Sequence, residues 1–482
     1  MSAKAATTAR ALGSICRRLL PSKSRARLAA ARRELDQGRA PDAARLLADL
    51  ARKGNAGAQT ELGRLYENGK GVVRNLADAA AWYRAAAEQG DAVAMARLAA
   101  LLSSGGQAGP SARDDAPASL FRNGLDLARD PVAARSYAER AAKANNVDGQ
   151  ALAGYMHAAG IGGPVDMAAA RRFYEPAAKA GNVEAALGMG TLLAGGHLGT
   201  PDFAGSRHWF GVAAEAGNTT AQTSLATDYV QGLGGPADPE KGVALFKQAA
   251  VKGHGPALRA LGILYLAGHG VTADRVHGET FLRGAAAAGD AEALVRLGDL
   301  YATQNETEAA DWYRRAAEAG SKRAQRVMAD CYKAGKGVPR DPETAMSWLR
   351  RAADGGDREA QFALGVAYAL GDGVEKDFAR ALTWSKAAAE AGHPVAKVNL
   401  GRFRMQGVGG SRDPGEALRW LQGALNDGES AAVAALGELF AFWTEPPDIE
   451  RARALFERAI TLGDTRGHEL LKKLNALGPQ RR

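Results

Sequence analysis

Cysteine, proline and aromatic residues are scarce in this chain of 482 residues. Two cysteines, Cys16 and Cys331, cannot build a disulfide framework or a four-cysteine metal site. Few prolines and few β-branched residues, beside abundant alanine, favour helices over strands. No apolar run approaches the roughly 18 residues that a membrane-spanning helix requires. These absences exclude a disulfide-stapled domain and a spanning helix, and they predict an all-α protein.

Acidic residues are absent from positions 1–33, which hold nine of the 62 lysines and arginines. The other 53 basic side chains balance the 53 aspartates and glutamates, so the net charge of +9 belongs to the N-terminal end. Because phosphate attraction dominates non-specific nucleic-acid binding, a body without net charge binds nucleic acid poorly. We therefore expect no nucleic-acid partner.

Residues 1–23 form a basic arm, for which we predict a disordered, solvated tail. Contact of residues 1–33 with an acidic partner or an anionic membrane surface, an organelle transit peptide and a nucleic-acid contact stay open as alternatives. The apolar run of residues 11–16 stops at Arg17, short of the about seven residues that a secretory signal needs. We expect a cytoplasmic protein, with a peripheral position at the inner face of a membrane as the alternative.

One glycine recurs along the chain and marks a repeat. Its spacing is 36 residues in eight of eleven intervals, and the other intervals are 55, 31 and 35 residues. Eleven units therefore cover residues 55–463. The marker glycines are Gly54, Gly90, Gly181, Gly217, Gly253, Gly289, Gly320, Gly356, Gly392, Gly428 and Gly463, with Asn145 in their place once.

Other residues keep phase with the marker glycine. In the first unit, Ala58, Leu62 and Tyr66 follow Gly54 by four, eight and twelve positions, which places them on one face of a helix. The small residue after the leucine, here Gly63, lets a neighbouring helix approach closely. Six of the seven tryptophans share a position on a second helix and are expected in the core: Trp82, Trp209, Trp312, Trp348, Trp384 and Trp420. The marker glycine ends that helix in a left-handed conformation.

This pattern predicts a helical hairpin that cannot bury its own apolar face. Stacked hairpins bury that face against one another, so the predicted fold is an all-α, right-handed superhelical α/α solenoid of eleven to twelve helix–turn–helix repeats. The chain resembles the Sel1-like repeat family, relatives of the tetratricopeptide repeats, in its Ala-x-x-x-Leu-Gly-x-x-Tyr motif, in Trp-Tyr/Leu-x-x-Ala-Ala and in Gly-x-Gly-Val-x-x-Asp. The last motif occurs at Gly335, Gly337, Val338 and Asp341 and again at Gly371, Gly373, Val374 and Asp377.

Both ends of the array and one insertion depart from the repeat. Residues 24–54 are expected to form a degenerate capping hairpin, and residues 464–482 a capping helix with a tail, because an open solenoid end leaves an apolar face wet. An insertion at about 104–128 contains Leu120 and Phe121. It is interpreted either as a loop that covers its own repeats or as an element that docks a partner.

The sequence shows no phosphate-loop, metal-ligand or catalytic motif. The glycine-rich turns follow a helix and lack the Ser or Thr of a phosphate loop, so they indicate backbone geometry. The eight histidines show no metal-ligand spacing, and Cys331 is interpreted as a small half-buried residue. We expect no catalytic residue, no cofactor and no metal.

The resemblance implies an adaptor that holds protein partners in signalling, secretion or envelope-associated complexes. By analogy with tetratricopeptide superhelices, the first helices line a concave groove that binds a protein or peptide, and positions ten after the marker glycine face it. An RNA-binding repeat protein and a regulatory subunit of an enzyme complex are the alternatives. The predicted partner-binding residues are Arg64, Tyr155, Thr191, Thr227, Ile263, Asp299, Asp330, Val366, Arg402 and Glu438, with Leu120 and Phe121 in the insertion.

Overall fold

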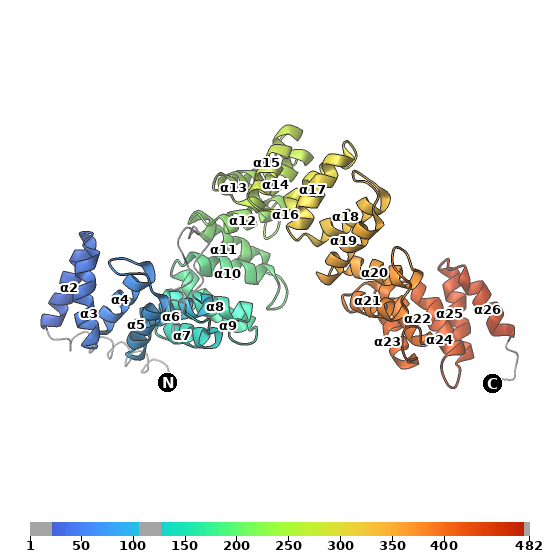
Figure 1. Ribbon diagram of the computed structural model, residues 1–482, viewed down its shortest axis with the longest axis horizontal. Helices are drawn as coiled ribbons and strands as arrows, with labels where there is room; N and C mark the ends of the chain where they lie inside the picture. The colour runs from blue at the N-terminus through green and yellow to red at the C-terminus, as the bar shows by residue number, and fades with distance from the viewer. Residues whose placement is uncertain (1–21, 106–126, 477–482) are drawn as a thin grey trace. The chain divides into compact units, whose positions relative to one another are not determined.

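The computed structural model describes residues 22–105 and 127–476, which form 25 α-helices and, within those ranges, no strand. The helices fall into two compact units, which meet in sequence between Lys252 and Gly253. Figure 1 shows that consecutive helices lie side by side along each unit. None of these helices is both long and apolar enough to cross a lipid bilayer.

The first unit holds twelve helices and the second holds thirteen. The helices of the first unit are α2 (Ser22–Asp36), α3 (Ala40–Arg52), α4 (Ala56–Asn68), α5 (Leu76–Glu88), α6 (Ala92–Ser104), α7 (Pro131–Lys143), α8 (Val147–Ala159), α9 (Met167–Lys179), α10 (Val183–Ala194), α11 (Phe203–Glu215), α12 (Thr219–Gln231) and α13 (Pro239–Val251). Those of the second unit are α14 (Gly255–Ala267), α15 (Arg275–Ala287), α16 (Ala291–Tyr301), α17 (Glu306–Glu318), α18 (Lys322–Ala334), α19 (Pro342–Asp354), α20 (Arg358–Leu370), α21 (Phe378–Glu390), α22 (Pro394–Gln406), α23 (Pro414–Asn426), α24 (Ala431–Phe442), α25 (Ile449–Thr461) and α26 (Arg466–Ala476).

Each repeat is a hairpin whose first helix has an even number and whose second helix has an odd one, as in α4 with α5. The second helix also packs on the first helix of the next repeat, as α5 does on α6. First helices of neighbouring repeats contact one another directly, for example α8 with α10 and α22 with α24. The predicted stack of helical hairpins, an α solenoid, is therefore confirmed.

Short polar side chains and left-handed glycines set the helix boundaries. The side chain of Asn182 accepts a hydrogen bond from the backbone N–H of Ala185 at 2.9 Å and thereby caps α10. At the other end of a hairpin, marker glycine Gly181 has φ +87°. Asn145, which replaces the glycine once, has φ +60° and is the one non-glycine residue with positive φ in the described ranges. The left-handed conformation predicted at the marker position is thus confirmed.

Glycines in several of the turns inside hairpins allow a close backbone approach. At Gly71, which has φ +71°, an added Cβ would overlap the carbonyl group of Ala40 at the start of α3. Gly234 meets the carbonyl oxygen of Phe203 at the start of α11 in the same way. These turns therefore press against the second helix of the preceding repeat, and only glycine fits there. The backbone role predicted for the glycine-rich turns is confirmed.

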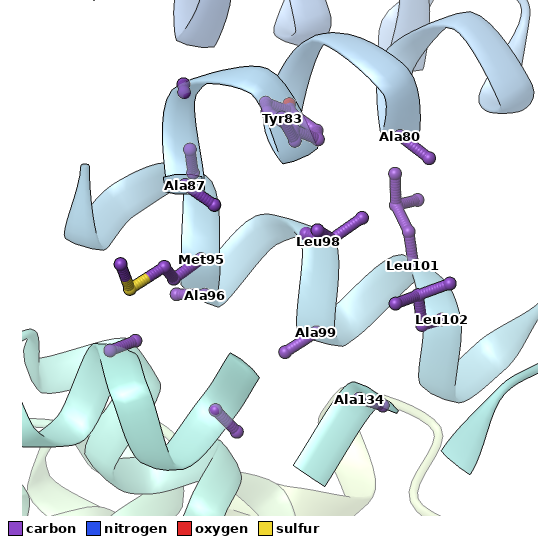
Figure 2. Packing of buried hydrophobic residues seen from close by; sticks show 14 of the residues in the cluster. Ala80, Tyr83, Ala87, Met95, Ala96, Leu98, Ala99, Leu101, Leu102 and Ala134 are labelled. Atoms are coloured by element: carbon purple, nitrogen blue, oxygen red, sulfur yellow. The ribbon is translucent and has the colours of Figure 1, made fainter. Parts of the chain in front are cut away.

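In most hairpins the core pairs a glycine of the first helix with a large side chain of the second. An added Cβ on Gly63 would lie 2.8 Å from the ring of Tyr83, and one on Gly190 would lie 2.5 Å from the ring of Phe210. Figure 2 shows the surrounding packing, in which Tyr83 of α5 lies over Leu98 of α6, both fully buried. The small residue predicted to admit a neighbouring helix is confirmed, and the group that fills the space is an aromatic or leucine side chain.

The tryptophan column packs against the core, as predicted, but most of its members lie at the margin of the core. Trp312 is buried, but Trp82, Trp209, Trp348, Trp384 and Trp420 are only half-buried. The fully enclosed side chain is the next residue along the helix, such as Tyr83 after Trp82. Successive helical residues point about 100° apart, so the tryptophan lies at the margin of the core. There it contacts arginines, as Trp312 does with Arg315, whose guanidinium carbon lies 4.4 Å from the ring centroid.

At the two ends of the described chain, helices lie against the terminal repeats. The α2–α3 pair packs on α4, and the buried Leu470 and Leu474 of α26 join the apolar cluster of α24 and α25. The capping roles predicted for residues 24–54 and 464–482 stay predictions. In the insertion, Leu127 packs on the cluster of α5 to α8, whereas Leu120 and Phe121 lie outside the described residues.

Candidate functional site

A groove of about 800 Å³ lies between α8 and α10, the first helices of two consecutive repeats in the first unit. We call it the α8–α10 groove. The intervening second helix, α9, contributes Met167 and Tyr174. The other lining residues are Asp148, Ala151, Leu152, Tyr155, Ala158, Ala159, Asn182, Glu184, Leu187, Gly188, Thr191, Leu192 and His197.

The floor of the groove is apolar. Tyr174 is 5% exposed, and its ring lies beneath Gly188, where an added Cβ would come within 2.5 Å of the ring carbon that bears the hydroxyl group. Burial raises the pKa of Tyr174 to about 12, so its hydroxyl group stays neutral. Leu152 and Leu187, both half-buried, complete this surface. An apolar side chain of a partner would lose water on contact with it.

One wall carries an aromatic ring that the fold leaves in solvent. Tyr155 is 52% exposed although it belongs to the first helix α8, whose neighbouring residues Gly154 and Met156 are buried. Amphipathic aromatic residues with two side-chain torsions contribute large contact areas at interfaces for a small loss of entropy. The exposed ring of Tyr155 thus offers a contact that nothing in its own repeat uses.

Two carboxylates lie at the opening of the groove. Asp148 and Glu184 belong to the first turns of α8 and α10, and both are exposed. Each accepts one hydrogen bond from a neutral amide: Asn182 donates to Asp148 at 3.4 Å, and Asn218 donates to Glu184 at 3.2 Å. Among the described residues, no lysine, arginine or histidine nitrogen lies within 4.0 Å of either carboxylate. Helices α8, α10 and α12 contain no lysine or arginine, so the fully charged side chains that line the groove are these two acids.

The structure brings two of the predicted partner-binding residues together in this groove, namely Tyr155 and Thr191. In the second unit it pairs Arg402 with Glu438 at 3.9 Å, and both side chains are mostly buried. Burial raises the pKa of the Glu438 carboxyl and lowers that of the Arg402 guanidinium. Asp299 accepts hydrogen bonds from the Tyr313 hydroxyl at 2.8 Å and from Arg323 at 3.0 Å. These charged positions are therefore occupied by partners within the chain.

The remaining predicted residues belong to separate first helices, α4 and α12 in the first unit and α14, α18 and α20 in the second. Arg64 is exposed and 3.7 Å from Glu61, and the Thr227 hydroxyl donates to the Thr223 carbonyl oxygen at 2.9 Å. Ile263 and Val366 are half-buried, and Asp330 is exposed.

Sequence reasoning missed Asp148, Leu152, Glu184 and Leu187. A usable signal was present, because Asp148 and Leu152 precede Tyr155 by seven and three residues and so share its helix face. The tenth position of each repeat is only one residue of this helix face, which extends over two turns. That two adjacent faces meet over Tyr174 depends on packing between repeats, which the sequence pattern alone does not show.

Outside the groove, the reactive residue types have structural surroundings. Cys331 is half-buried, and burial raises the pKa of its thiol, which favours the less reactive protonated form. His393 caps α22 by accepting from the Ala396 N–H at 3.2 Å, and its other ring nitrogen lies 3.1 Å from Glu359. Within the ranges that the structure describes, no three His, Cys, Asp or Glu residues gather as metal ligands would.

Comparison with known proteins adds an independent finding. The Sel1 repeat model matches eleven segments, residues 56–91, 116–146, 147–182, 183–218, 219–254, 255–290, 291–321, 322–357, 358–393, 394–428 and 430–464. No curated protein matches.

Solved structures similar to the chain include three bacterial proteins. A protective antigen of uropathogenic Escherichia coli strains, which displays an SLR fold, is 28% identical over 91% of each chain with a TM-score of 0.49. A Sel1 repeat protein from Oxalobacter formigenes is 31% identical over 51% of this chain and 96% of its own, with a TM-score of 0.38. An immunity protein from Pseudomonas aeruginosa is 20% identical over 51% of this chain and 81% of its own, with a TM-score of 0.28.

Proposed function

Because this chain belongs to the Sel1 repeat family, whose solenoids generally serve as protein-interaction scaffolds, we propose that it is a non-enzymatic adaptor. It binds protein partners on the exposed face of its first helices, and the α8–α10 groove is the principal site. The partner belongs to a signalling, secretion or envelope-associated complex, as the family resemblance implies.

The observation that carries this proposal is the combination of an apolar floor with an exposed aromatic wall. Tyr155 is half in solvent beside a surface formed by Leu152, Leu187 and the buried ring of Tyr174. Large exposed aromatic residues at apolar clefts are typical anchors of protein interfaces. An extended peptide or a helix whose apolar side chains enter the groove fits this chemistry.

The rest of the repeat supports binding by holding the groove in shape. Gly188 and Gly190 keep α10 tight against the rings of Tyr174 and Phe210, and Asn182 fixes the start of the helix. A site built on packed helices loses little conformational freedom when a partner binds. The entropy lost on binding therefore comes mainly from ordering the partner, because the scaffold is already ordered.

Site-specific photocrosslinking tests the proposal. A photoreactive phenylalanine analogue replaces Tyr155 in the groove or, as control, Arg172, which is exposed on the second helix α9. We expect a discrete crosslinked protein from cells only with the analogue at position 155. The added substitution Leu187→Lys should reduce the yield about tenfold, because it places a charge on the apolar floor. Equal yields from positions 155 and 172, or a yield that ignores Leu187→Lys, would contradict the proposed site.

A further inference from the structure

We propose that the α8–α10 groove binds the N-terminal arm of a second copy of this chain, through residues 8–20. The proposal rests on the groove being a peptide-binding site, as proposed above, and it names one occupant of that site. Three features carry it: the charge of each side, the spacing of the arm's apolar residues, and the length of chain between the arm and α2.

The carboxylates of the groove and the arginines of the arm are opposite in charge. The opening of the groove holds Asp148 and Glu184, whose hydrogen-bond donors are neutral amides. The arm offers Arg10, Arg17 and Arg18, and no acidic residue occurs before Glu34. Pairing of arginines with exposed carboxylates steers association and gives orientation. An acid-free basic segment therefore meets a surface whose first helices α8, α10 and α12 carry no lysine or arginine.

The apolar residues of the arm match the groove in spacing. Leu12, Ile15 and Leu19 follow the i, i+3, i+7 pattern of one helix face. Seven helical residues span about 10 Å, the same length that separates Asp148 from Tyr155 along α8. One basic amphipathic segment thus has the length to lay its leucines on the apolar floor while its arginines stay at the acidic opening.

The short segment between the arm and α2 indicates that the arm in the groove comes from a second copy of the chain. Helix α2 begins at Ser22, so only two residues separate Leu19 from it, a reach of about 10 Å. The groove lies three repeats away from α2, and packed helices are about 10 Å apart, which makes a distance of the order of 30 Å. The arm of the same molecule is too short to place Leu19 in its own groove. The arm of another molecule has no such constraint.

Peptide binding to the full chain tests the charge requirement. A fluorescein-labelled peptide of residues 5–21 is titrated into the full-length protein and followed by anisotropy. The double substitution Asp148→Lys/Glu184→Lys should weaken binding at least tenfold. The matched control Glu318→Lys/Asp354→Lys changes the net charge equally, at exposed acids on second helices of the second unit, and should alter affinity less than twofold. Equal losses in both variants would reduce the interaction to non-specific charge and overturn the proposal.

A variant peptide tests the apolar requirement without altering the protein. Leu12→Ser/Leu19→Ser keeps every charge, and we expect it to lose at least tenfold in affinity. Sedimentation velocity of the full chain should show association that rises with concentration and is lost on Arg17→Glu/Arg18→Glu. If the peptide binds vesicles containing phosphatidylserine but not the protein, the arm is a membrane contact and the proposal falls. The photocrosslink at position 155 would still report partner binding in that case, so the two failures are distinguishable.

Discussion

The α8–α10 groove and the first helices of the second unit use one scaffold but present different chemistry. In the second unit, charged side chains join neighbouring repeats: Arg323 lies 3.0 Å from Asp299, and Arg259 lies 3.0 Å from Asp290. In the groove, Asp148 and Glu184 face no cation among the described residues, and Tyr155 is exposed. A face whose charges are paired internally has little left to offer a partner, whereas unpaired acids beside an apolar floor remain available.

The core packing beneath the α8–α10 groove and beneath the first helices of the second unit is the same. The two regions therefore differ only at residues that point away from the core. Gly190 faces Phe210 in the first unit, and Gly437 faces Phe456 in the second; in both, an added Cβ would lie 2.5 Å from a ring carbon. A repeat protein can therefore change its binding surface without changing its packing, because the two sets of residues lie on opposite sides of the same helix.

The largest expected effect tests this shared core. Gly190→Leu and Gly437→Leu should each destabilise the protein by about 3 kcal/mol, because the added side chain cannot fit beside the aromatic ring. Gly211→Leu in α11 is the matched control, since an added Cβ there meets nothing within 4 Å. Native-state hydrogen exchange of the helix concerned measures the loss. A large cost in only one of the two units would show that the cores are not equivalent.

A smaller effect concerns a buried acid in the first unit. Asp228 of α12 is 5% exposed at the position where the preceding repeat has Leu192, and burial raises its pKa to about 6. The unfolded pKa is about 3.9, so the folded chain holds the proton more tightly. Its contribution to stability is therefore present below about pH 4, declines from pH 4 to 6 and is lost above pH 6.

Asp228→Leu should accordingly raise the opening free energy of α12 by about 2 kcal/mol at pH 7.5, with a smaller gain near pH 4. Hydrogen exchange of the α12 amides, corrected for intrinsic rates at each pH, measures this difference. Thr220→Leu, at an exposed residue of α12 that does not ionise, is the control and should show no comparable pH dependence. A gain for Asp228→Leu that is constant with pH would mean that ionisation of Asp228 does not destabilise the fold.

The smallest expected effect concerns the ion pairs of the second unit. Arg323→Ala removes contacts to Asp299 at 3.0 Å and Glu292 at 3.6 Å, and the arginine is 44% exposed. Such pairs contribute about 0.5 kcal/mol, and salt screens them, so the loss should shrink in 0.5 M sodium chloride. Asp148→Ala should leave stability unchanged at both salt concentrations. Exchange protection of α16 and α8 provides the readout, and equal effects of the two substitutions would remove the distinction between the faces.

Much of the fold was predictable because the same local sequence signals recur from repeat to repeat. The left-handed glycines, the small residue beside the leucine and the helical hairpins all follow from local preferences and from a period of 36 residues. The tryptophan column shows less, because a repeated position indicates a constant environment and does not say how deep in the interior that environment lies. Which of Trp82 and Tyr83 is enclosed depends on the rotation of the helix against its neighbours.

The candidate site was predictable only in part. Tyr155 and Thr191 were expected on a binding face, and they line the groove. Arg402 and Glu438 were expected on the same kind of face, yet they pair with each other. The repeat position is identical in all four cases, so sequence phase cannot separate an available residue from one that its neighbour in the next repeat has already bound.

The sequence by itself determined the architecture of each repeat, since backbone conformation, helix ends and apolar periodicity act within a few residues of one another. Tertiary structure alone decided where the surface is open. The contact of α8 with α10 over the Tyr174 ring creates the groove, and contacts such as Arg323 with Asp299 close the corresponding faces elsewhere. Both depend on distances between side chains of different repeats, which are set only when the helices pack.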